Sequence, residues 1–129
     1  MESYTTQITV KQEHLDQLHH VNNIQYVSWV QDIAITHWEK AITEHIRNSY
    51  FWVLLQHSIS YKKPAFLNDV IEVKTFIKSA KGVRSIRCVE FYNSETQTLL
   101  ATSDTTWCLF NKENKKPTRI TEDILNCFN

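Results

Sequence analysis

A polar segment at residues 16–23 holds the side chains of this sequence that are best suited to chemistry. It reads Asp-Gln-Leu-His-His-Val-Asn-Asn and precedes a run without glycine or proline, residues 24–46, that is predicted to form a helix. The first turn of a helix leaves N–H groups unpaired and carries a partial positive charge, which suits an anion or a polarised carbonyl. The segment therefore predicts a reactive site, with a simple capping loop, in which Asn22 or Asn23 caps the helix, as the alternative.

Each of these side chains has a role in such a site and a simpler structural role. Asp16 could attack an activated carbonyl or activate water, or it could cap a turn. His20 could orient water or donate a hydrogen bond, or it could pack and bond to the backbone. The backbone N–H groups from Val21 to Asn23 could stabilise a developing oxyanion. The amides of Asn22 and Asn23 belong to the same candidate site, with helix capping as their structural role.

The rest of the chain predicts the elements that must position this segment. Alternation and turn signals predict strands at residues 4–11, 51–61, 69–78, 83–92 and 98–110, and a short terminal helix begins at Thr121. The helix at 24–46 is apolar around much of its circumference, so we expect the strands to wrap it. One strand, one helix and four strands in a meander predict an α+β fold, a five-stranded antiparallel sheet around a long central helix, in a single domain of residues 1–129.

Two local features of the strands carry further predictions. Gly82 is the only glycine in the chain, and we expect it at a hairpin turn with positive φ. Strict alternation at 51–61 predicts that one face of that strand carries Phe51, Val53, Leu55, His57, Ile59 and Tyr61.

The composition and charge exclude several classes of partner. Hydrophobic residues make up 42% and charged residues 22% of the 129 residues, as in globular domains. Fourteen basic and fourteen acidic residues give zero net charge, which argues against nucleic acid as a partner and favours self-association. The sequence shows no signal peptide and no apolar run of membrane length, so we expect no membrane partner. Three widely spaced cysteines without metal-ligand spacing indicate a reducing, cytoplasmic setting, and we expect no metal and no cofactor.

Two motifs together resemble those of a known family. The first combines Asp16, His-Val-Asn-Asn at 20–23 and Tyr26 with a tryptophan-bearing helix, and the second is Ile-Ser-Tyr-Lys-Lys-Pro-Ala-Phe-Leu-Asn-Asp at 59–69. They resemble hotdog-fold acyl-CoA thioesterases of the group that includes 4-hydroxybenzoyl-CoA thioesterase, and are similar to the plant acyl-ACP thioesterases. The Gly-Val-Arg-Ser segment from Gly82 also fits, and the resemblance runs along nearly the whole chain.

The resemblance implies a hydrolase that converts an acyl-CoA, or an acyl-ACP, thioester to free acid and thiol. Asp16 stands where the 4-hydroxybenzoyl-CoA branch has its catalytic aspartate, which acts as nucleophile or base. The loop departs from the family at two positions. Acyl-ACP thioesterases have Asp, Asn and His at two-residue spacing, whereas this chain has Leu18 in the middle. Family loops commonly have a glycine before His-Val-Asn-Asn, and this chain has His19, which adds bulk there.

The resemblance also implies an acyl pocket and a binding site for coenzyme A. The candidates for contact with the substrate are Val21, Tyr26, Trp29, His57 and Tyr61, and all are equally suited to core packing. Five basic residues are candidates for coenzyme A phosphates or, alternatively, a solvated surface: Lys62, Lys63, Lys81, Arg84 and Arg87.

An assembly of two or four copies is expected, because an open sheet edge needs a partner and the sites of hotdog proteins are built from two chains. We therefore expect a homodimer or homotetramer with a role in fatty acid metabolism. Two other functions stay open for a chain with this resemblance. One is a hotdog dehydratase acting on acyl-ACP, and the other is a non-catalytic acyl-CoA-binding protein, which the departures at Leu18 and His19 keep open.

Overall fold

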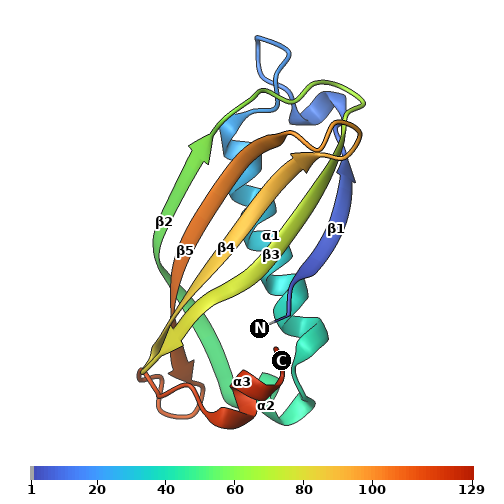
Figure 1. Ribbon diagram of the computed structural model, residues 1–129. Coiled ribbons are helices and arrows are strands. Elements are labelled where there is room, and N and C mark those ends of the chain that lie inside the picture. The colour runs from blue at the N-terminus through green and yellow to red at the C-terminus, as the bar shows by residue number, and fades with distance from the viewer. Residues whose placement is uncertain (1) are drawn as a thin grey trace.

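The computed structural model describes residues 2–129 as one five-stranded antiparallel sheet packed against a long helix (Figure 1). The elements in chain order are β1 (Tyr4–Thr9), a 3-10 turn (Gln12–His14), α1 (Asn23–Ala41), α2 (Glu44–Ser49), β2 (Tyr50–Tyr61), β3 (Val70–Lys81), β4 (Arg84–Asn93), β5 (Leu99–Asn111) and α3 (Glu122–Asn126). The predicted α+β fold, with a five-stranded antiparallel sheet and a long helix, is confirmed.

The strand order corrects the predicted meander. The sheet runs β1-β3-β4-β5-β2, so only β3, β4 and β5 follow one another as hairpins. β2 pairs with β5 at one edge, and β1 pairs with β3 at the other edge. The segment between β2 and β3, residues 62–69, contains Pro64 and crosses the end of the sheet instead of closing a tight turn. Alternation predicts that a segment is a strand, but it does not predict which strand it pairs with.

The predicted helix at residues 24–46 is two helices. α1 ends at Ala41, and Ile42 is extended, with φ −90° and ψ 159°. Thr43 then caps α2, because its Oγ1 accepts a hydrogen bond from the backbone N–H of Ile46 at 3.2 Å. A threonine at this position is an N-cap signal that ends one helix and starts the next.

A bulge in β2 corrects the predicted face of that strand. The pairing with β5 passes from Leu54 opposite Trp107 to Gln56 opposite Thr106, which leaves Leu55 as an extra residue. The extra residue shifts the alternation, so the odd-numbered residues before the bulge and those after it do not share one face. Before the bulge, Trp52 packs against Trp38 of α1, while Phe51 stacks on Phe110 of β5.

The turn chemistry predicted for Gly82 is confirmed. Its φ is +63°, and it forms with Val83 the two-residue turn between β3 and β4. The three cysteines are free thiols, with Cys88 and Cys108 buried. No helix in residues 2–129 is long and apolar enough to cross a membrane.

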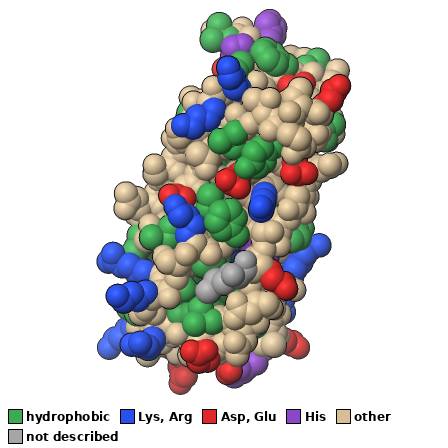
Figure 2. All heavy atoms as spheres, in the orientation of Figure 1, with side chains coloured by type: hydrophobic (Ala, Val, Ile, Leu, Met, Phe, Trp, Pro, Cys, Tyr) green, Lys and Arg blue, Asp and Glu red, His purple; other side chains and the backbone are tan. Residues whose placement is uncertain are grey.

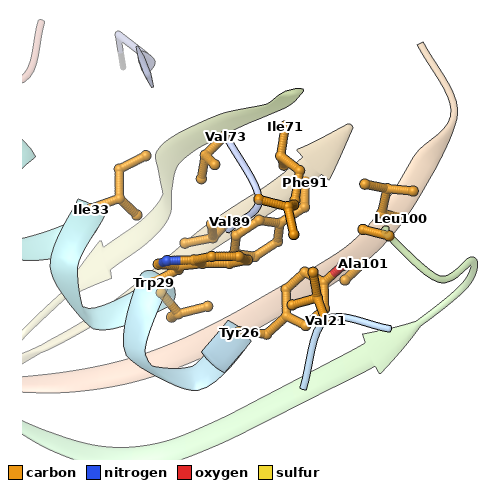
Figure 3. Close-up of a cluster of buried hydrophobic side chains, with 13 residues drawn as sticks. Val21, Tyr26, Trp29, Ile33, Ile71, Val73, Val89, Phe91, Leu100 and Ala101 are labelled. Carbon is orange, nitrogen blue, oxygen red and sulfur yellow. The ribbon is translucent and has the colours of Figure 1, made fainter. Parts of the chain in front are cut away.

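The core fills the space between α1 and the inner face of the sheet (Figure 3). Tyr26 of α1 meets Trp29 and Phe91 edge-on, with ring centroids 5.5 and 5.0 Å apart. Val30, Val73 and Phe91 have no exposed surface. A second apolar cluster surrounds the end of α1 and joins Ile42, Ile46, Leu109, Ile120, Ile124 and Phe128.

A layer of buried polar residues lies between the two clusters. On β3, Thr75 falls between Val73 of the first cluster and Ile77, which packs on the second. We use the name polar layer for the buried residues at this level: His37, Thr75, Arg87, Ser103 and Thr105. The layer divides the inside of the protein into two apolar compartments.

Candidate active site

The loop from Leu15 to Val21 projects beyond the end of the sheet, at the start of α1 (Figure 1). An isolated bridge joins Leu15 to Val21 and closes the loop at its base. Inside it, the backbone N–H of Asp16 donates to the carbonyl of His20 at 2.8 Å, and the N–H of His19 donates to the carbonyl of Asp16 at 3.1 Å. Histidine side chains gather at this end of the molecule (Figure 2).

Asp16 has one carboxylate oxygen tied to the loop. Its Oδ1 accepts hydrogen bonds from the backbone N–H groups of Leu18, at 2.9 Å, and His20, at 3.2 Å. Within residues 2–129, no hydrogen bond goes to its Oδ2. The two backbone bonds fix the direction of the carboxylate. Because the side chain is only half-buried, its Oδ2 remains free for a ligand.

Of the three backbone N–H groups predicted to stabilise an oxyanion, only one is free to do so in the part of the chain that the structure describes. The N–H of Val21 donates to the carbonyl of Ala65 at 2.9 Å, and the N–H of Asn22 donates to the carbonyl of His14 at 2.9 Å. Both are therefore used within the chain, which corrects the prediction that they stabilise an oxyanion. Among the described residues, the N–H of Asn23 has no such partner. It points along the helix axis at the positive end of the dipole.

Asn22 caps α1. Its side-chain Oδ1 accepts from the backbone N–H of Ile24 at 3.0 Å, and its φ of −65° and ψ of 139° are those of a cap. The amide therefore has the structural role that was the alternative for this residue. Asn23 occupies the first helical position and is exposed.

The tyrosines support the helix start. Tyr61 at the end of β2 donates its hydroxyl to the carbonyl of Asn23 at 3.3 Å, and its ring meets that of Tyr26 at 5.6 Å. The Tyr26 hydroxyl is buried without a partner among the described residues. Burial, and then the nearby Tyr61 and Asp69, raise the pKa of Tyr26 to about 12, so the phenol stays protonated.

The remaining predicted residues divide between this end of the protein and its interior. The rings of His20 and Phe66 meet edge to face at 5.1 Å, and the buried ring of Trp29 makes a similar contact with His14 at 5.0 Å. His57 is distant from the loop in the same chain. It lies four residues before Tyr61, about 13 Å along the strand, and both of its ring nitrogens are buried without a partner within residues 2–129.

Sequence reasoning missed the apolar rim of this site. Leu18 and Ile24 are 72% and 76% exposed, and Phe66 and Leu67 in the loop after β2 are 48% and 43% exposed. The Ala-Phe-Leu run directly after Pro64 is a signal that could have found the second pair, because apolar residues are unusual in a polar crossing. The four side chains, which we call the apolar rim, lie in the Asp16 loop, at the start of α1 and in the segment after β2.

One of the five basic residues predicted to contact coenzyme A phosphates is not available for that role. Arg87 is 6% exposed and lies on the inner face of the sheet, so it does not meet a phosphate at the surface. Lys62, Lys63, Lys81 and Arg84 are exposed. Across residues 2–129, no group of three or more His, Cys, Asp and Glu side chains is arranged to hold a metal ion.

A family model covers almost the entire chain. The model of the acyl-ACP thioesterase N-terminal domain matches residues 1–128. The chain belongs to this family. The resemblance to thioesterases is thereby confirmed, and so, at the level of the family, is the prediction of a thioester hydrolase.

Individual proteins are similar to the chain in sequence or in fold. The long-chain acyl-CoA thioesterase FadM of Escherichia coli is 28% identical over 86 residues, which are 63% of this chain and 63% of FadM. A 1,4-dihydroxy-2-naphthoyl-CoA thioesterase from Synechocystis has the same fold, with a TM-score of 0.84, 18% identity, and 98% and 96% of the two chains covered. A mutant of 4-hydroxybenzoyl-CoA thioesterase in complex with 4-hydroxybenzoyl-CoA gives a TM-score of 0.86, with 13% identity and 98% and 99% covered.

His19 has the backbone that favours the glycine found in family loops. Its φ is +63°, in the left-handed region, which costs a residue with a Cβ about 1–2 kcal/mol. We predict that His19→Gly raises the free energy of unfolding by about 1 kcal/mol, after the larger chain entropy of glycine is counted. Gln17→Gly is the control in the same loop, and should lower stability. Urea unfolding measures both, and a less stable His19→Gly protein would contradict the backbone argument.

Proposed function

We propose that this protein hydrolyses an acyl-CoA thioester to a free acid and a thiol, with Asp16 as the catalytic carboxylate. The observation that carries the proposal is the free Oδ2 of a carboxylate held by two backbone N–H bonds beside a helix start. Family membership supports thioester hydrolysis, and the named acyl-CoA thioesterases among the similar proteins support coenzyme A as the carrier.

The proposed chemistry uses three groups at the helix start. Asp16 Oδ2 attacks the thioester carbonyl, or takes a proton from the water that attacks it. The carbonyl oxygen becomes an oxyanion, which accepts a hydrogen bond from the N–H of Asn23. The C–S bond then breaks and the thiolate leaves. After direct attack the product is an acyl anhydride of Asp16, which water hydrolyses to the free acid and the Asp16 carboxylate, and the proton released goes to the thiolate. After water activation the free acid forms directly, and Asp16 passes the proton that it took from water to the thiolate. His20 orients the water, held by its contact with Phe66.

The acyl chain lies over the apolar rim in this proposal, and Lys62 and Lys63 lie close to the phosphates. Both lysines are exposed at the start of the segment that carries Phe66 and Leu67. A phosphate at this surface gains from each lysine as a point charge.

Substitution of Asp16 by asparagine tests the carboxylate without disturbing the loop. The asparagine Oδ1 can still accept from Leu18 and His20, so the loop bonds remain while the charge and the free Oδ2 are lost. We expect Asp16→Asn to lower kcat for an acyl-CoA by at least about a hundredfold with little change in melting temperature. Asp16→Ala is the comparison, because it also removes both backbone bonds and should lower the melting temperature. Near-normal turnover by Asp16→Asn would remove Asp16 from the mechanism.

The leaving group is the basis of a further prediction. A thiolate leaves readily, so one carboxylate suffices, whereas an alkoxide needs stronger activation. We expect hydrolysis of at least one acyl-CoA, in a panel from acetyl to palmitoyl and aromatic, and none of the matching oxygen esters. Release of thiol measured with a thiol reagent checks this. If acyl-CoA binds and no member of the panel is cleaved, the protein is the non-catalytic alternative.

We also propose that the edge of β2 joins two copies of the chain. Within residues 2–129, β2 pairs only with β5, so its other edge is unpaired. Antiparallel pairing of β2 with its copy would bring the Tyr61 end of one chain, and the adjoining Asp16 loop, toward the Tyr50 end of the other.

The molecular mass in solution tests the proposed assembly directly. We predict that light scattering at micromolar concentration gives a mass of two or four chains. The physical reason is the row of unpaired N–H and C=O groups along the β2 edge, which a second strand satisfies. The mass of one chain across the whole micromolar range would rule out this arrangement.

A further inference from the structure

A cavity of about 340 Å³ opens beside the second half of α1, far from the Asp16 loop of the same chain. Its walls include Trp38 of α1, Trp52 of β2 and Trp107 of β5. The helix advances about 1.5 Å per residue, so Trp38 lies about 22 Å along the axis from the Asn23 start. The volume is at the lower end of the range for small-molecule sites, about 300–1,000 Å³.

Arg87 of the polar layer lines this cavity. Its Nη1 donates to Nδ1 of His37 at 2.8 Å and to Oγ1 of Thr75 at 3.1 Å. His37 therefore presents an unprotonated nitrogen, and it stays neutral because burial, and then the charge of Arg87, lower its pKa to about 4. Both partners of the guanidinium are uncharged.

The charge of Arg87 has no counter-ion among the described residues. The ion pairs within residues 2–129 are Arg47–Glu39 and Lys78–Asp104. Burial lowers the pKa of Arg87 to about 10, and the group remains a cation at neutral pH. A buried charge without a partner is costly, so an anion that reaches it gains a strong, poorly screened interaction.

The unused edge of the guanidinium has the geometry of a carboxylate clamp. Of its five N–H groups, those on Nε and Nη2 donate to no group in the described part of the chain. These nitrogens are also absent from the fully enclosed unpaired atoms, which belong to Tyr26, His57 and Ser103. Together they form the planar fork that binds a carboxylate through two parallel hydrogen bonds.

The charges at the mouth also favour an anion. Arg47, Lys112 and Glu39 line the cavity, and Glu39 is paired with Arg47 at 2.6 Å. With Arg87, the cavity has three cationic side chains and one anionic side chain. The walls are mostly apolar, and one buried cation matches a single negative charge better than the several charges of a phosphorylated ligand.

We propose that this cavity is a second ligand site, which binds a monocarboxylate with an apolar body by pairing the carboxylate with Arg87 inside the protein. The tryptophans contact the apolar body, and the guanidinium selects the charge. The site does not rest on Asp16 or on hydrolysis.

Tryptophan fluorescence tests the site directly, because three tryptophans line it. We expect octanoate to bind the wild-type protein at least about tenfold more tightly than octanamide, which has the same shape without the charge. Arg87→Met should abolish this preference, while Arg84→Met, at an exposed arginine of the same strand, should retain it. Octanoate should also raise the melting temperature of the wild-type protein and leave that of Arg87→Met unchanged.

Three outcomes would overturn the proposal. They are equal affinity of the wild-type protein for octanoate and octanamide, no fluorescence response to octanoate at millimolar concentration, and an unchanged preference in Arg87→Met. The wild-type comparison decides by itself if Arg87→Met fails to fold. Arg87→Lys, which keeps the charge and loses the fork, should show a reduced preference. Loss of octanoate binding with normal acyl-CoA hydrolysis would reject this site and leave the proposed function intact.

Discussion

The burial of one face of α1 against the inner face of the sheet is the interaction on which the structure depends. Tyr26, Trp29, Val30 and Ile33 are all nearly inaccessible to solvent, and a buried side chain of this size contributes about 1.5–3 kcal/mol. The same packing fixes where the helix begins. Because Tyr61 at the end of β2 bonds to the carbonyl of Asn23, the first turn is held at the end of the sheet. The candidate catalytic groups thus owe their positions to the core beneath them.

The polar layer is the exception within this apolar packing, and it has a cost. A lone guanidinium in the interior loses most of its hydration free energy. Its hydrogen bonds to the neutral side chains of His37 and Thr75 compensate for only part of that loss. An apolar residue of similar length in its place would avoid this cost. A cation retained inside a protein at such a cost is a sign of function, because binding sites are where unfavourable groups concentrate.

Sequence patterns predicted the parts of this protein that depend on local chemistry. The strands, the positive φ of Gly82 and the cap at Thr121 followed from alternation, glycine and a hydroxyl beside acidic residues. The pairing of β2 with β5 did not follow, because alternation carries no information about the neighbouring strand. The burial of Arg87 could have been predicted from the sequence, because Arg87 shares one face of β4 with Val89 and Phe91. The use of the Val21 and Asn22 N–H groups depends on contacts with distant segments, which no local pattern contains.

The bulge at Leu55 has a consequence for how the protein behaves at high concentration. β2 is an edge strand of twelve residues, rich in aromatic and branched side chains, and a flat strand of that kind is a template for uncontrolled addition of further chains. The extra residue interrupts the ladder and twists the strand at its middle. Neither half offers more than six regular residues to an incoming strand. The bulge therefore protects the protein against amyloid-like stacking, while leaving room for a specific partner.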